Sequence, residues 1–451
     1  MTKIFGTDGI RCLVNHEPLT AETCLKISKS IAFVLKKKTQ DLRRAVICKD
    51  TRLSGYLYEP LVTAGFISMG MDVILVGPLP TPAVPLLIRT LRADLGVMIT
   101  ASHNTYEYNG LKFFDHKGVK LSSVIEKKVE KIISDNKKYS KITNNINKLG
   151  KAKRLEDASG RYSEFLKRTL LKVKRTNKLK IILDCANGAT YNIAPNLFWE
   201  LGHKVISINN KPDGININQK CGAVDTNELS KHVLKNDADI GFAFDGDGDR
   251  LIVIDEKGNE VDGDKIIALF SKHFVSDKNK FKNKNIVITK MSNMGLEMYL
   301  RDKLGLVVRR TDVGDINVIR KMKTSNALLG GEQSGHIIFS EYANTGDGIL
   351  AALKITEILT SSKIKTSSMF NLYKDYEQKK INIKYSFKNK NLIKSIDIIN
   401  KSKLFNSHNI RTLVRFSGTE PLIRILVEGK DKDIVKKNFN KINSMIRKCL
   451  D

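Results

Sequence analysis

The chain has 451 residues, of which 41% are hydrophobic, and a formal net charge of +29 at pH 7. This length predicts roughly three or four domains of ordinary size. No segment approaches the ~20 consecutive apolar residues needed to cross a bilayer, and residues 1–11 lack the apolar core of a secretory signal. We therefore expect a cytoplasmic protein that does not enter a membrane.

The positive charge is spread along the whole chain, with 58 lysines against 19 arginines. Basic chains attract polyanions, so a polyanion-binding protein is one alternative. However, no basic segment is interleaved with the aromatic side chains on which nucleic-acid bases stack. The six cysteines are scattered and form no C-x-x-C pair, which argues against a zinc site or a disulfide framework. We expect no nucleic-acid partner.

Hydrophobic spacing predicts alternating strands and helices through most of the chain. The first unit is predicted to contain a helix around residues 27–35 and strands at 45–48, 73–76 and 95–99. A Lys- and Asn-rich stretch at 135–153 then predicts a boundary. Such alternation favours parallel sheets with crossover helices.

Two further units continue this pattern, and the C-terminal part departs from it. The second unit has predicted strands at 179–183, 205–208 and 240–244 and predicted helices at 191–201 and 228–234. The third has predicted strands at 286–289, 307–309 and 327–329 and predicted helices at 296–304 and 349–359. The tail has predicted strands at 379–385, 412–416 and 422–428 and predicted helices at 391–401 and 431–449. It indicates a smaller α+β domain, and the Lys-rich stretches at 278–284 and 384–394 are interpreted as solvated loops.

The most specific motif is D-G-D-G-D-R at residues 245–250, directly after a predicted buried strand. The glycines allow a tight turn in which Asp245, Asp247 and Asp249 converge. Three converging carboxylates repel one another unless a cation lies among them, and hard oxygen ligands suit Mg²⁺. A calcium EF-hand is excluded because residues 251–254 form an apolar strand within its loop. An acidic turn without a metal is the alternative.

The motif T-A-S-H-N at residues 100–104 also follows a predicted strand. Ser102 can present its hydroxyl to a substrate there, although a simple turn is the alternative. No G-x-S-x-G elbow is present, and neighbouring Ser and His side chains diverge, so a phosphoryl carrier fits better than a hydrolase. Downstream, Lys112 is a candidate general acid or base, provided that nearby cations lower its pKa.

Two later motifs are typical of sugar and phosphate binding. In G-G-E-Q-S-G-H (residues 330–336), Glu, Ser and His at alternate positions would face one side of an extended loop and contact hydroxyl groups. In R-F-S-G-T-E-P (residues 415–421), arginines, hydroxyls and glycine-freed N–H groups indicate a phosphate nest. A Gly-rich turn and a hairpin turn are the respective alternatives. Residues 6–11 and 49–52 each place an arginine where it can help hold phosphate.

These motifs occur in the order and spacing of the α-D-phosphohexomutase superfamily. The segments F-G-T-D-G-I-R, K-D-T-R, D-C-A-N-G-A-T and S-N-M-G-L-E resemble most those of the bacterial phosphoglucosamine mutases, and the resemblance covers essentially the whole chain. It implies four domains around a central cleft, three of a related mixed α/β type and a C-terminal α+β domain. We place their limits at 1–150, 151–258, 259–370 and 371–451.

The resemblance implies an isomerase that converts glucosamine 6-phosphate to glucosamine 1-phosphate for UDP-N-acetylglucosamine and cell-wall precursor synthesis. One Mg²⁺ per active site, a glucosamine 1,6-bisphosphate intermediate that also primes the enzyme, and an outside phosphate donor for Ser102 are implied as well. The oligomeric state stays open, with a homodimer as one candidate. A phosphoglucomutase or phosphomannomutase is the alternative within the class, and a metal phosphatase is the alternative outside it.

The resemblance also implies a role for each motif residue. Ser102 would carry the phosphate and, with Asp245, Asp247 and Asp249, hold Mg²⁺. The residues around the transferring group would be Arg11, His103, Lys112 and Arg250, with Lys112 as the proton shuttle. The residues that bind the substrate would be Glu332, Ser334, His336, Arg415, Ser417, Gly418, Thr419 and Arg424. The departures from the family pattern are Cys12, Thr105, Tyr108 and Ile316.

Overall fold

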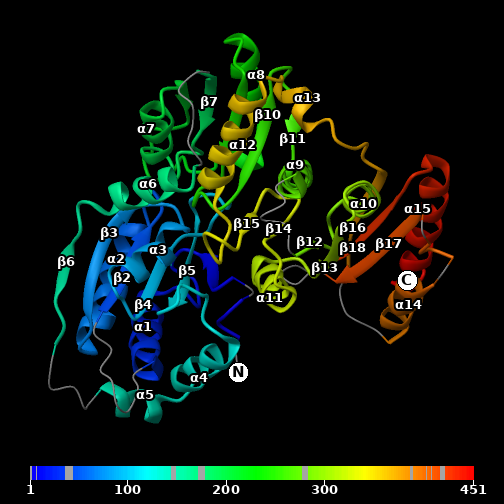
Figure 1. Cartoon of the computed structure of the whole chain (residues 1–451). Helices are drawn as coiled ribbons and strands as arrows, with labels where there is room; N and C mark the ends of the chain where they lie inside the picture. Colours follow the sequence, from blue (N-terminus) through cyan, green and yellow to red (C-terminus); the bar gives the residue numbers. More distant parts are fainter. Residues whose placement is uncertain are drawn as a thin grey trace.

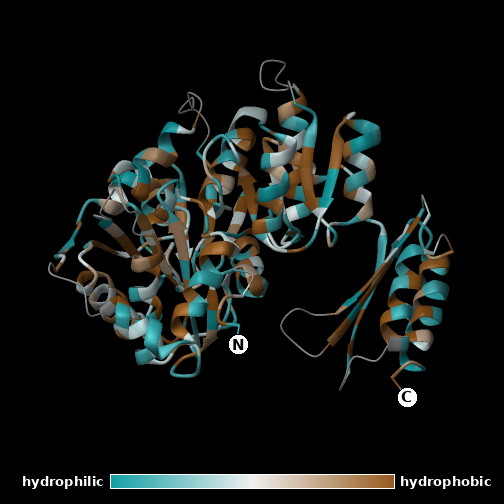
Figure 2. Ribbon diagram, turned by 90° about the horizontal axis from the view of Figure 1, so that it is seen from below, coloured by the Kyte–Doolittle hydropathy of each residue, from teal (hydrophilic) through white to brown (hydrophobic). Residues whose placement is uncertain are grey.

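Four β-sheets follow one another along the chain (Figure 1). The computed structural model describes residues 3–6, 8–35, 44–143, 149–170, 178–276, 283–385, 390–402, 404–407, 409–416 and 422–450. The first three sheets lie in one body, whereas the fourth lies apart from it at the C-terminal end (Figure 2). No helix in the described part of the chain is long and apolar enough to cross a membrane.

The first sheet has six strands in the order β1-β5-β4-β2-β3-β6. The strands are β1 (Ile10–Leu13), β2 (Arg44–Lys49), β3 (Asp72–Pro78), β4 (Leu95–Ile99), β5 (Tyr108–Asp115) and β6 (Ala152–Arg154). The helices are α1 (Ala21–Leu35), α2 (Gly55–Ser68), α3 (Ala83–Thr90), α4 (Ser123–Ile133) and α5 (Asn136–Thr143). The predicted strands and helix are confirmed. The sheet is mixed, because β5 runs antiparallel to β4 and β1 antiparallel to β5.

Two features of this sheet are absent from the predictions. The polar stretch at 135–153 contains α5 and part of β6, and β6 pairs with β3 beyond the predicted domain limit at residue 150. Strand β5 is not predicted either, because Asn109 and Lys112 interrupt its apolar pattern. Both side chains are nevertheless buried. A buried lysine in a strand needs carboxylates beside it. For Lys112 these come from both the first and the second unit.

The second sheet has five strands in the order β11-β10-β9-β7-β8. The strands are β7 (Lys180–Asp184), β8 (Lys204–Ile208), β9 (Ile240–Phe244), β10 (Leu251–Asp255) and β11 (Glu260–Val261). The helices are α6 (Ala158–Arg168), α7 (Ile193–Glu200), α8 (Asn227–Lys235) and the short 3₁₀ helix η1 (Gly222–Val224). All five residues of β9 are buried, as expected for a central strand covered on both faces.

The third sheet has four strands in the order β13-β12-β14-β15. The strands are β12 (Asn285–Thr289), β13 (Val307–Thr311), β14 (Leu329–Gly331) and β15 (Ile337–Phe339). The helices are α9 (Gly263–Ser276), α10 (Met294–Met298), the π-helical turn η2 (Tyr299–Lys303), α11 (Asp315–Ser325), α12 (Gly348–Ser362) and α13 (Thr366–Phe370). Helix α12 packs against β9 and β10 of the second sheet. One apolar core, with Met98, Phe242 and Leu353 among its members, therefore runs through all three units.

The C-terminal unit is a three-stranded antiparallel sheet in the order β16-β18-β17, with two helices on one face (Figure 2). Its elements are β16 (Glu377–Lys384), α14 (Lys390–Lys401), β17 (Ile410–Phe416), β18 (Leu422–Gly429) and α15 (Lys432–Arg447). The loop interpretation of 384–394 is wrong from Lys390 onward, because buried Leu392, Ile396 and Ile399 have helical spacing. Residues 386–389, and 278–282 of the other Lys-rich stretch, lie outside the described residues.

Candidate active site

Ser102 follows β4 in a backbone conformation that is uncommon for a residue with a side chain. Its φ of 53° lies in the left-handed region, and the residue is buried. Its N–H donates to Thr100 Oγ1 (2.8 Å), and its carbonyl oxygen accepts from Arg52 Nη2 (2.9 Å) and Asn218 Nδ2 (2.8 Å). Groups from two units therefore hold this strained residue in place.

Arg52 has a structural role: it holds the loop at residues 100–108 that carries Ser102, called the serine loop below. Its side chain is buried, and its Nε donates to Asp50 Oδ2 (2.9 Å). The other guanidinium donors reach carbonyl oxygens of the serine loop, at Ser102, Asn104, Thr105 and Tyr108. The interpretation of residues 49–52 as a phosphate-holding segment is therefore wrong for Arg52, because its donors are already used. Two family departures, Thr105 and Tyr108, contact Arg52 through backbone oxygens, so these contacts do not depend on the side chains.

Asp245, Asp247 and Asp249 follow β9 and converge on one point. One carboxylate oxygen of each lies within 4.8 Å of the others, and all three residues are buried. The Ser102 hydroxyl donates to Asp245 Oδ2 over 2.8 Å, although 143 positions separate the two residues in the chain. The structure thus brings together the serine loop and the aspartate loop, the two segments on which the predicted chemistry depends.

The two glycines between these aspartates are needed for different reasons. A Cβ at Gly246 would lie 2.6 Å from Asn218 Nδ2 and 2.7 Å from the Ser102 carbonyl oxygen, so a side chain there would separate the two loops. Gly248 has a φ of 69°, a conformation that favours glycine. The close approach of the loops, more than the turn itself, therefore explains Gly246.

Lys112 projects from β5 into the aspartate cluster. Its Nζ lies 2.8 Å from Asp247 Oδ2 and 3.3 Å from both Asp249 Oδ2 and Asp8 Oδ2. Burial lowers the pKa of Lys112, but these carboxylates outweigh burial and raise the pKa well above its ordinary value. The sequence made Lys112 a candidate general acid or base on the condition that nearby cations lower its pKa. This condition is not met, because the carboxylates raise the pKa and keep the side chain as an ammonium group.

The aspartate cluster fits a divalent cation. Asp247 Oδ1 and Asp249 Oδ1 are buried and have no hydrogen-bond partner among the residues described. Burial, together with the neighbouring Asp249 and Asp247, raises the pKa of Asp245 well above its ordinary value. Buried carboxylate oxygens at this spacing, some of them lacking donors, suit the hard-oxygen coordination of Mg²⁺.

Arg11, His103 and Arg250 lie around the serine and the aspartates. Arg250 Nε is 3.9 Å from both Asp245 Oδ2 and Asp249 Oδ1. Arg11 Nη1 donates to Asn104 Oδ1 over 3.1 Å. Burial, with Arg250 and Arg11 close by, lowers the pKa of His103 to about 3. His103 is therefore neutral near pH 7, and the two arginines remain as the cations on this side of the site.

The loop between β14 and β15 carries Glu332, Ser334 and His336, but these residues do not face one side of an extended segment. The Gly335 N–H donates to the Glu332 carbonyl oxygen (3.0 Å) and closes a tight turn, in which Gly335 has a φ of 89°. Ser334 is exposed, whereas His336 is buried with its Nδ1 3.5 Å from Asp249 Oδ1. The extended-loop prediction is wrong. Besides Asp249, His336 contacts its own unit, because its Nε2 accepts the Gly346 N–H (2.9 Å) and lies 3.9 Å from Asp315 Oδ2.

Arg415 and Arg424 lie directly opposite each other on β17 and β18. Facing like charges repel, and burial together with Arg424 lowers the pKa of Arg415. Within the described residues, Arg415 Nε has no hydrogen-bond partner. This pair therefore suits an anion between the two guanidinium groups. The other predicted members of this site, Ser417, Gly418 and Thr419, lie outside the described residues.

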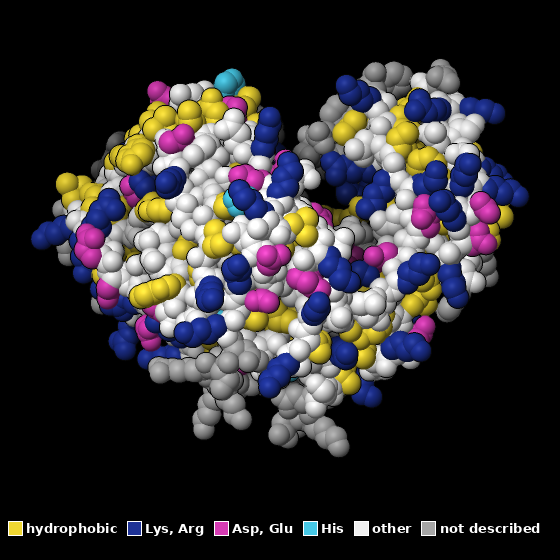
Figure 3. Space-filling view, turned by 90° about the horizontal axis from the view of Figure 1, so that it is seen from above, with side chains coloured by type: hydrophobic (Ala, Val, Ile, Leu, Met, Phe, Trp, Pro, Cys, Tyr) yellow, Lys and Arg dark blue, Asp and Glu magenta, His cyan; other side chains and the backbone are white. Residues whose placement is uncertain are grey.

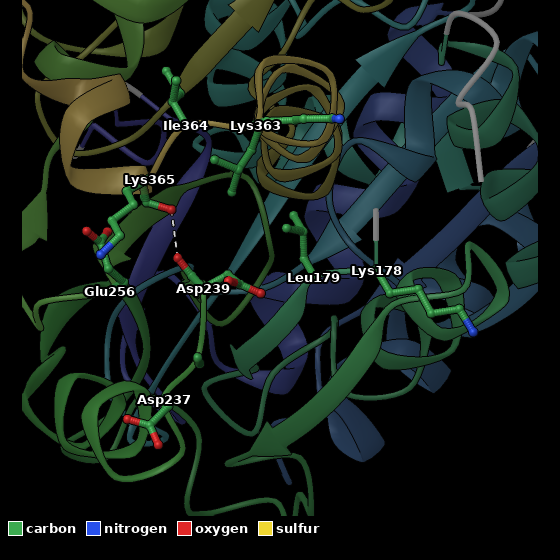
Figure 4. A pocket seen from close by; sticks show the side chains of 11 residues that line it. Lys178, Leu179, Asp237, Asp239, Glu256, Lys363, Ile364 and Lys365 are labelled. Atoms are coloured by element: carbon green, nitrogen blue, oxygen red, sulfur yellow. Dashed lines mark hydrogen bonds between the residues drawn. The ribbon is translucent and has the colours of Figure 1, made fainter. Parts of the chain in front are cut away.

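A hollow separates the C-terminal unit from the body, and lysine and arginine side chains gather on its walls (Figure 3). A cavity of about 810 Å³ lies elsewhere, between the second and third units (Figure 4). Its charged lining residues are Lys178, Asp237, Asp239, Glu256, Lys363 and Lys365. This cavity contains none of the predicted site residues, so size alone does not indicate the active site.

Several residues at the site have no sequence motif that predicts them. Thr81 Oγ1 donates to Asp247 Oδ2 (2.6 Å), and Asn218 donates to the serine loop. Asp8 belongs to the segment at residues 6–11, which was expected to contribute only its arginine, yet it contacts both Arg11 (3.3 Å) and Lys112 (3.3 Å). The one sequence signal for Asp8 is Lys112 in β5, because a lysine buried in a strand requires carboxylates close to it.

The chain matches four domain families over most of its length. These are the phosphoglucomutase/phosphomannomutase alpha/beta/alpha domains I (residues 2–140), II (160–258) and III (262–376) and the C-terminal domain (384–443). The chain belongs to the phosphoglucomutase/phosphomannomutase family. The three predicted mixed α/β domains and the distinct C-terminal domain are thereby confirmed, and so is a phosphohexomutase enzyme.

Among curated relatives, the phosphoglucosamine mutase of Granulibacter bethesdensis is 46% identical over 438 residues, which cover 96% of this chain and 94% of that protein. The phosphoglucosamine mutase of Zymomonas mobilis is 44% identical and covers 99% of both chains. These matches confirm the predicted resemblance to the bacterial phosphoglucosamine mutases.

Solved structures share the fold. A phosphoglucomutase/phosphomannomutase family protein from Burkholderia thailandensis superposes with a TM-score of 0.84 at 23% identity, covering 99% of this chain and 97% of that one. An Aspergillus fumigatus N-acetylphosphoglucosamine mutase, solved with GlcNAc-6P and magnesium, superposes with a TM-score of 0.64 at 17% identity, covering 99% and 96%.

Proposed function

We propose that this protein is a phosphoglucosamine mutase, which converts glucosamine 6-phosphate to glucosamine 1-phosphate. The observation that carries the proposal is the hydrogen bond from Ser102 Oγ to Asp245 Oδ2 inside a buried aspartate cluster. Relatives named phosphoglucosamine mutase that are 44–46% identical over 96–99% of the chain support the choice of substrate.

In the proposed reaction Ser102 carries the phosphoryl group. A sugar hydroxyl attacks the phosphorus, its new P–O bond forms as the bond to Ser102 Oγ breaks, and a sugar 1,6-bisphosphate results. The bisphosphate turns around, and the second transfer returns a phosphoryl group to Ser102. A bound Mg²⁺ supplies charge neutralisation to the transferring group. An outside donor or the bisphosphate itself must provide the first phosphate.

We assign proton transfer to Lys112. Its ammonium group contacts Asp247 and Asp249, which form one cluster with Asp245, the acceptor of the Ser102 hydroxyl. It can give a proton to the departing Ser102 oxygen, and the proton that the attacking sugar hydroxyl loses restores the ammonium group; in the second transfer both proton movements run in the opposite direction. Arg11 and Arg250 lie where they can stabilise the negative charge of the transferring group.

The remaining assignments concern substrate binding. Glu332 and Ser334 would contact sugar hydroxyls from the third unit, and Arg415 with Arg424 would hold the phosphate that does not react. The repulsion between the two facing arginines supports this last assignment, because a phosphate between them would accept charge-assisted hydrogen bonds from both. His336 Nδ1 lies 3.5 Å from Asp249 Oδ1, so we assign His336 the role of holding the Asp249 carboxylate in position.

The substrate is tested by assaying the phosphates of glucosamine, glucose and mannose side by side, with free phosphate measured in the same reactions. We expect the highest kcat/KM with glucosamine 6-phosphate and no steady release of phosphate. Equal or faster turnover of glucose 1-phosphate would instead identify a phosphoglucomutase. Steady phosphate release without isomer formation would identify a phosphatase.

A further inference from the structure

Lys120 joins the first unit to the third through two carboxylates. It lies between β5 and α4, and its side chain is only 10% exposed. Its Nζ forms ion pairs with Asp8 of the first unit and with Asp315 of the third. Burial lowers the pKa of Lys120, and the two carboxylates outweigh burial and raise it, so the side chain is a cation between two anions.

On the side of the first unit, this ion pair leads directly to the predicted catalytic groups. The Asp8 carboxylate that contacts Lys120 also lies 3.3 Å from Lys112 Nζ and 3.3 Å from Arg11 Nη2. Asp8 is therefore shared by three cations. Removing one of them changes the electrostatic attraction between Asp8 and the other two, because unit charges a few ångströms apart in a partly buried site interact strongly.

On the side of the third unit, the ion pair leads to the predicted sugar-binding loop. Asp315 is the first residue of α11, and the residue before it, Gly314, donates its N–H to Glu332 Oε1 over 2.9 Å. The next residue, Ile316, carries no charge. Asp315 pairs with Lys120 of the first unit and lies 3.9 Å from His336 Nε2 of its own unit. Ile316 and both lysines line a small cavity between these two units.

We propose that Lys120 is a positioning residue that couples the Glu332 loop of the third unit to Lys112 and Arg11 of the first. The proposal rests on the proposed mutase function. The physical link is the continuous series of contacts from Glu332 through Gly314, Asp315, Lys120 and Asp8 to Lys112. Without Lys120, the carboxylates of Asp8 and Asp315 face each other between the two units. Lys112 and Arg11 are then no longer held in a fixed position relative to the loop that carries Glu332.

The first test replaces Lys120 with methionine, which keeps the length of the side chain and removes its charge. Because small displacements of reacting groups cost on the order of 100-fold in rate, we expect kcat of Lys120→Met to fall at least about 30-fold, with KM changed less than about threefold. Lys117→Met is the matched control, since Lys117 lies exposed in the same segment. It should keep wild-type kcat and KM.

Asp315→Asn and the double variant Lys120→Met/Asp315→Asn complete the test. If Asp315 acts through Lys120, Asp315→Asn lowers kcat, and the double change lowers it no further than Lys120→Met does alone. Losses that multiply in the double variant would overturn the proposal, and so would wild-type kcat in Lys120→Met. If Lys120→Met does not fold, as judged by circular dichroism, a normal kcat in Asp315→Asn would also overturn it. A wild-type protein inactive on all three sugar phosphates would overturn the mutase function itself, and this inference with it.

Discussion

Asp245, Asp247 and Asp249 lie close enough for their charges to repel, and Lys112 supplies one cation among them. The residue types at these positions predict a metal site from sequence alone, because three converging carboxylates repel one another unless a cation lies among them. The partners of each aspartate are not predictable in this way. Thr81 and Asp8 contribute through contacts that no local pattern encodes.

At this scale the aspartate cluster gives a prediction about metal removal. Asp245→Asn removes one carboxylate from a buried group of mutually repelling aspartates. The free energy of unfolding measured in EDTA should therefore rise by about 1 kcal/mol or more. Wild type should be stabilised by added Mg²⁺, by about 2.7 kcal/mol at 100 times the Kd. The variant should lose most of this response and nearly all activity. An equal Mg²⁺ response in both proteins would argue against the cluster as the metal site.

The facing arginines of the C-terminal unit give a second prediction at the residue scale. Arg415→Ala should raise KM for the sugar phosphate about 30-fold, because a charge-assisted hydrogen bond to phosphate contributes roughly 2 kcal/mol. Its effect on kcat should be smaller, since this phosphate does not react. Arg447→Ala, on the exposed surface of α15, is the control. Steady-state kinetics that show a kcat effect alone would count against the assignment.

Among the elements, the strands with continuous apolar runs are predictable, and those that carry function are less so. Strand β4 has five buried apolar positions and is found where the sequence predicts it. Strand β5 carries Asn109 and Lys112 inside the sheet, so its pattern resembles a loop. The sequence offers the turn at Gly335 only as the alternative to an extended loop, because alternating Glu, Ser and His resemble an extended segment. In both cases a functional polar side chain replaces the apolar signal.

The contact between the serine loop and the aspartate loop gives a prediction at the element scale. Gly246→Ala places a methyl group against Asn218 Nδ2 and the Ser102 carbonyl oxygen, so we expect a loss of at least about 2 kcal/mol in stability and most of the activity. Gly160→Ala in α6 is the matched control, since nothing lies within 4 Å of its added Cβ. Chemical unfolding of both variants measures the difference. An unaffected Gly246→Ala protein would show that the loops do not approach this closely.

For the whole molecule, the sequence predicts four units and their order but not how they join. The boundary signal at 135–153 falls near the junction of the matched domains I (residues 2–140) and II (160–258), yet β6 at its end pairs within the first sheet, and α12 of the third unit packs against the second sheet. Long-range packing of this kind depends on surfaces that form only after each unit folds. A shared apolar core joins the first three units, and the site residues lie where these units meet.

The junction between the third and C-terminal units gives a prediction about pH. Burial, with Asp262 nearby, raises the pKa of Asp264 to about 7, and Asp264 accepts the Asn293 N–H (2.6 Å) next to this junction. The folded state therefore keeps the proton on Asp264 to a higher pH than the unfolded state, in which the pKa of this carboxyl group is 3.8. Stability from this group is lost as pH rises from about 4 to about 7. The unfolding midpoint of Asp264→Asn, relative to wild type, should increase between pH 5 and pH 8. A constant difference would contradict this.

The account depends most on the transfer of phosphate through Ser102. Intact mass and mutase activity of wild type and Ser102→Ala, purified in the same way, test it directly. We predict an adduct of about 80 Da on the wild type that is absent from the variant, with mutase activity lost in the variant almost completely. Substantial mutase activity in Ser102→Ala, or an adduct of the same mass on both proteins, would contradict the assignment of Ser102 as the phosphoryl carrier.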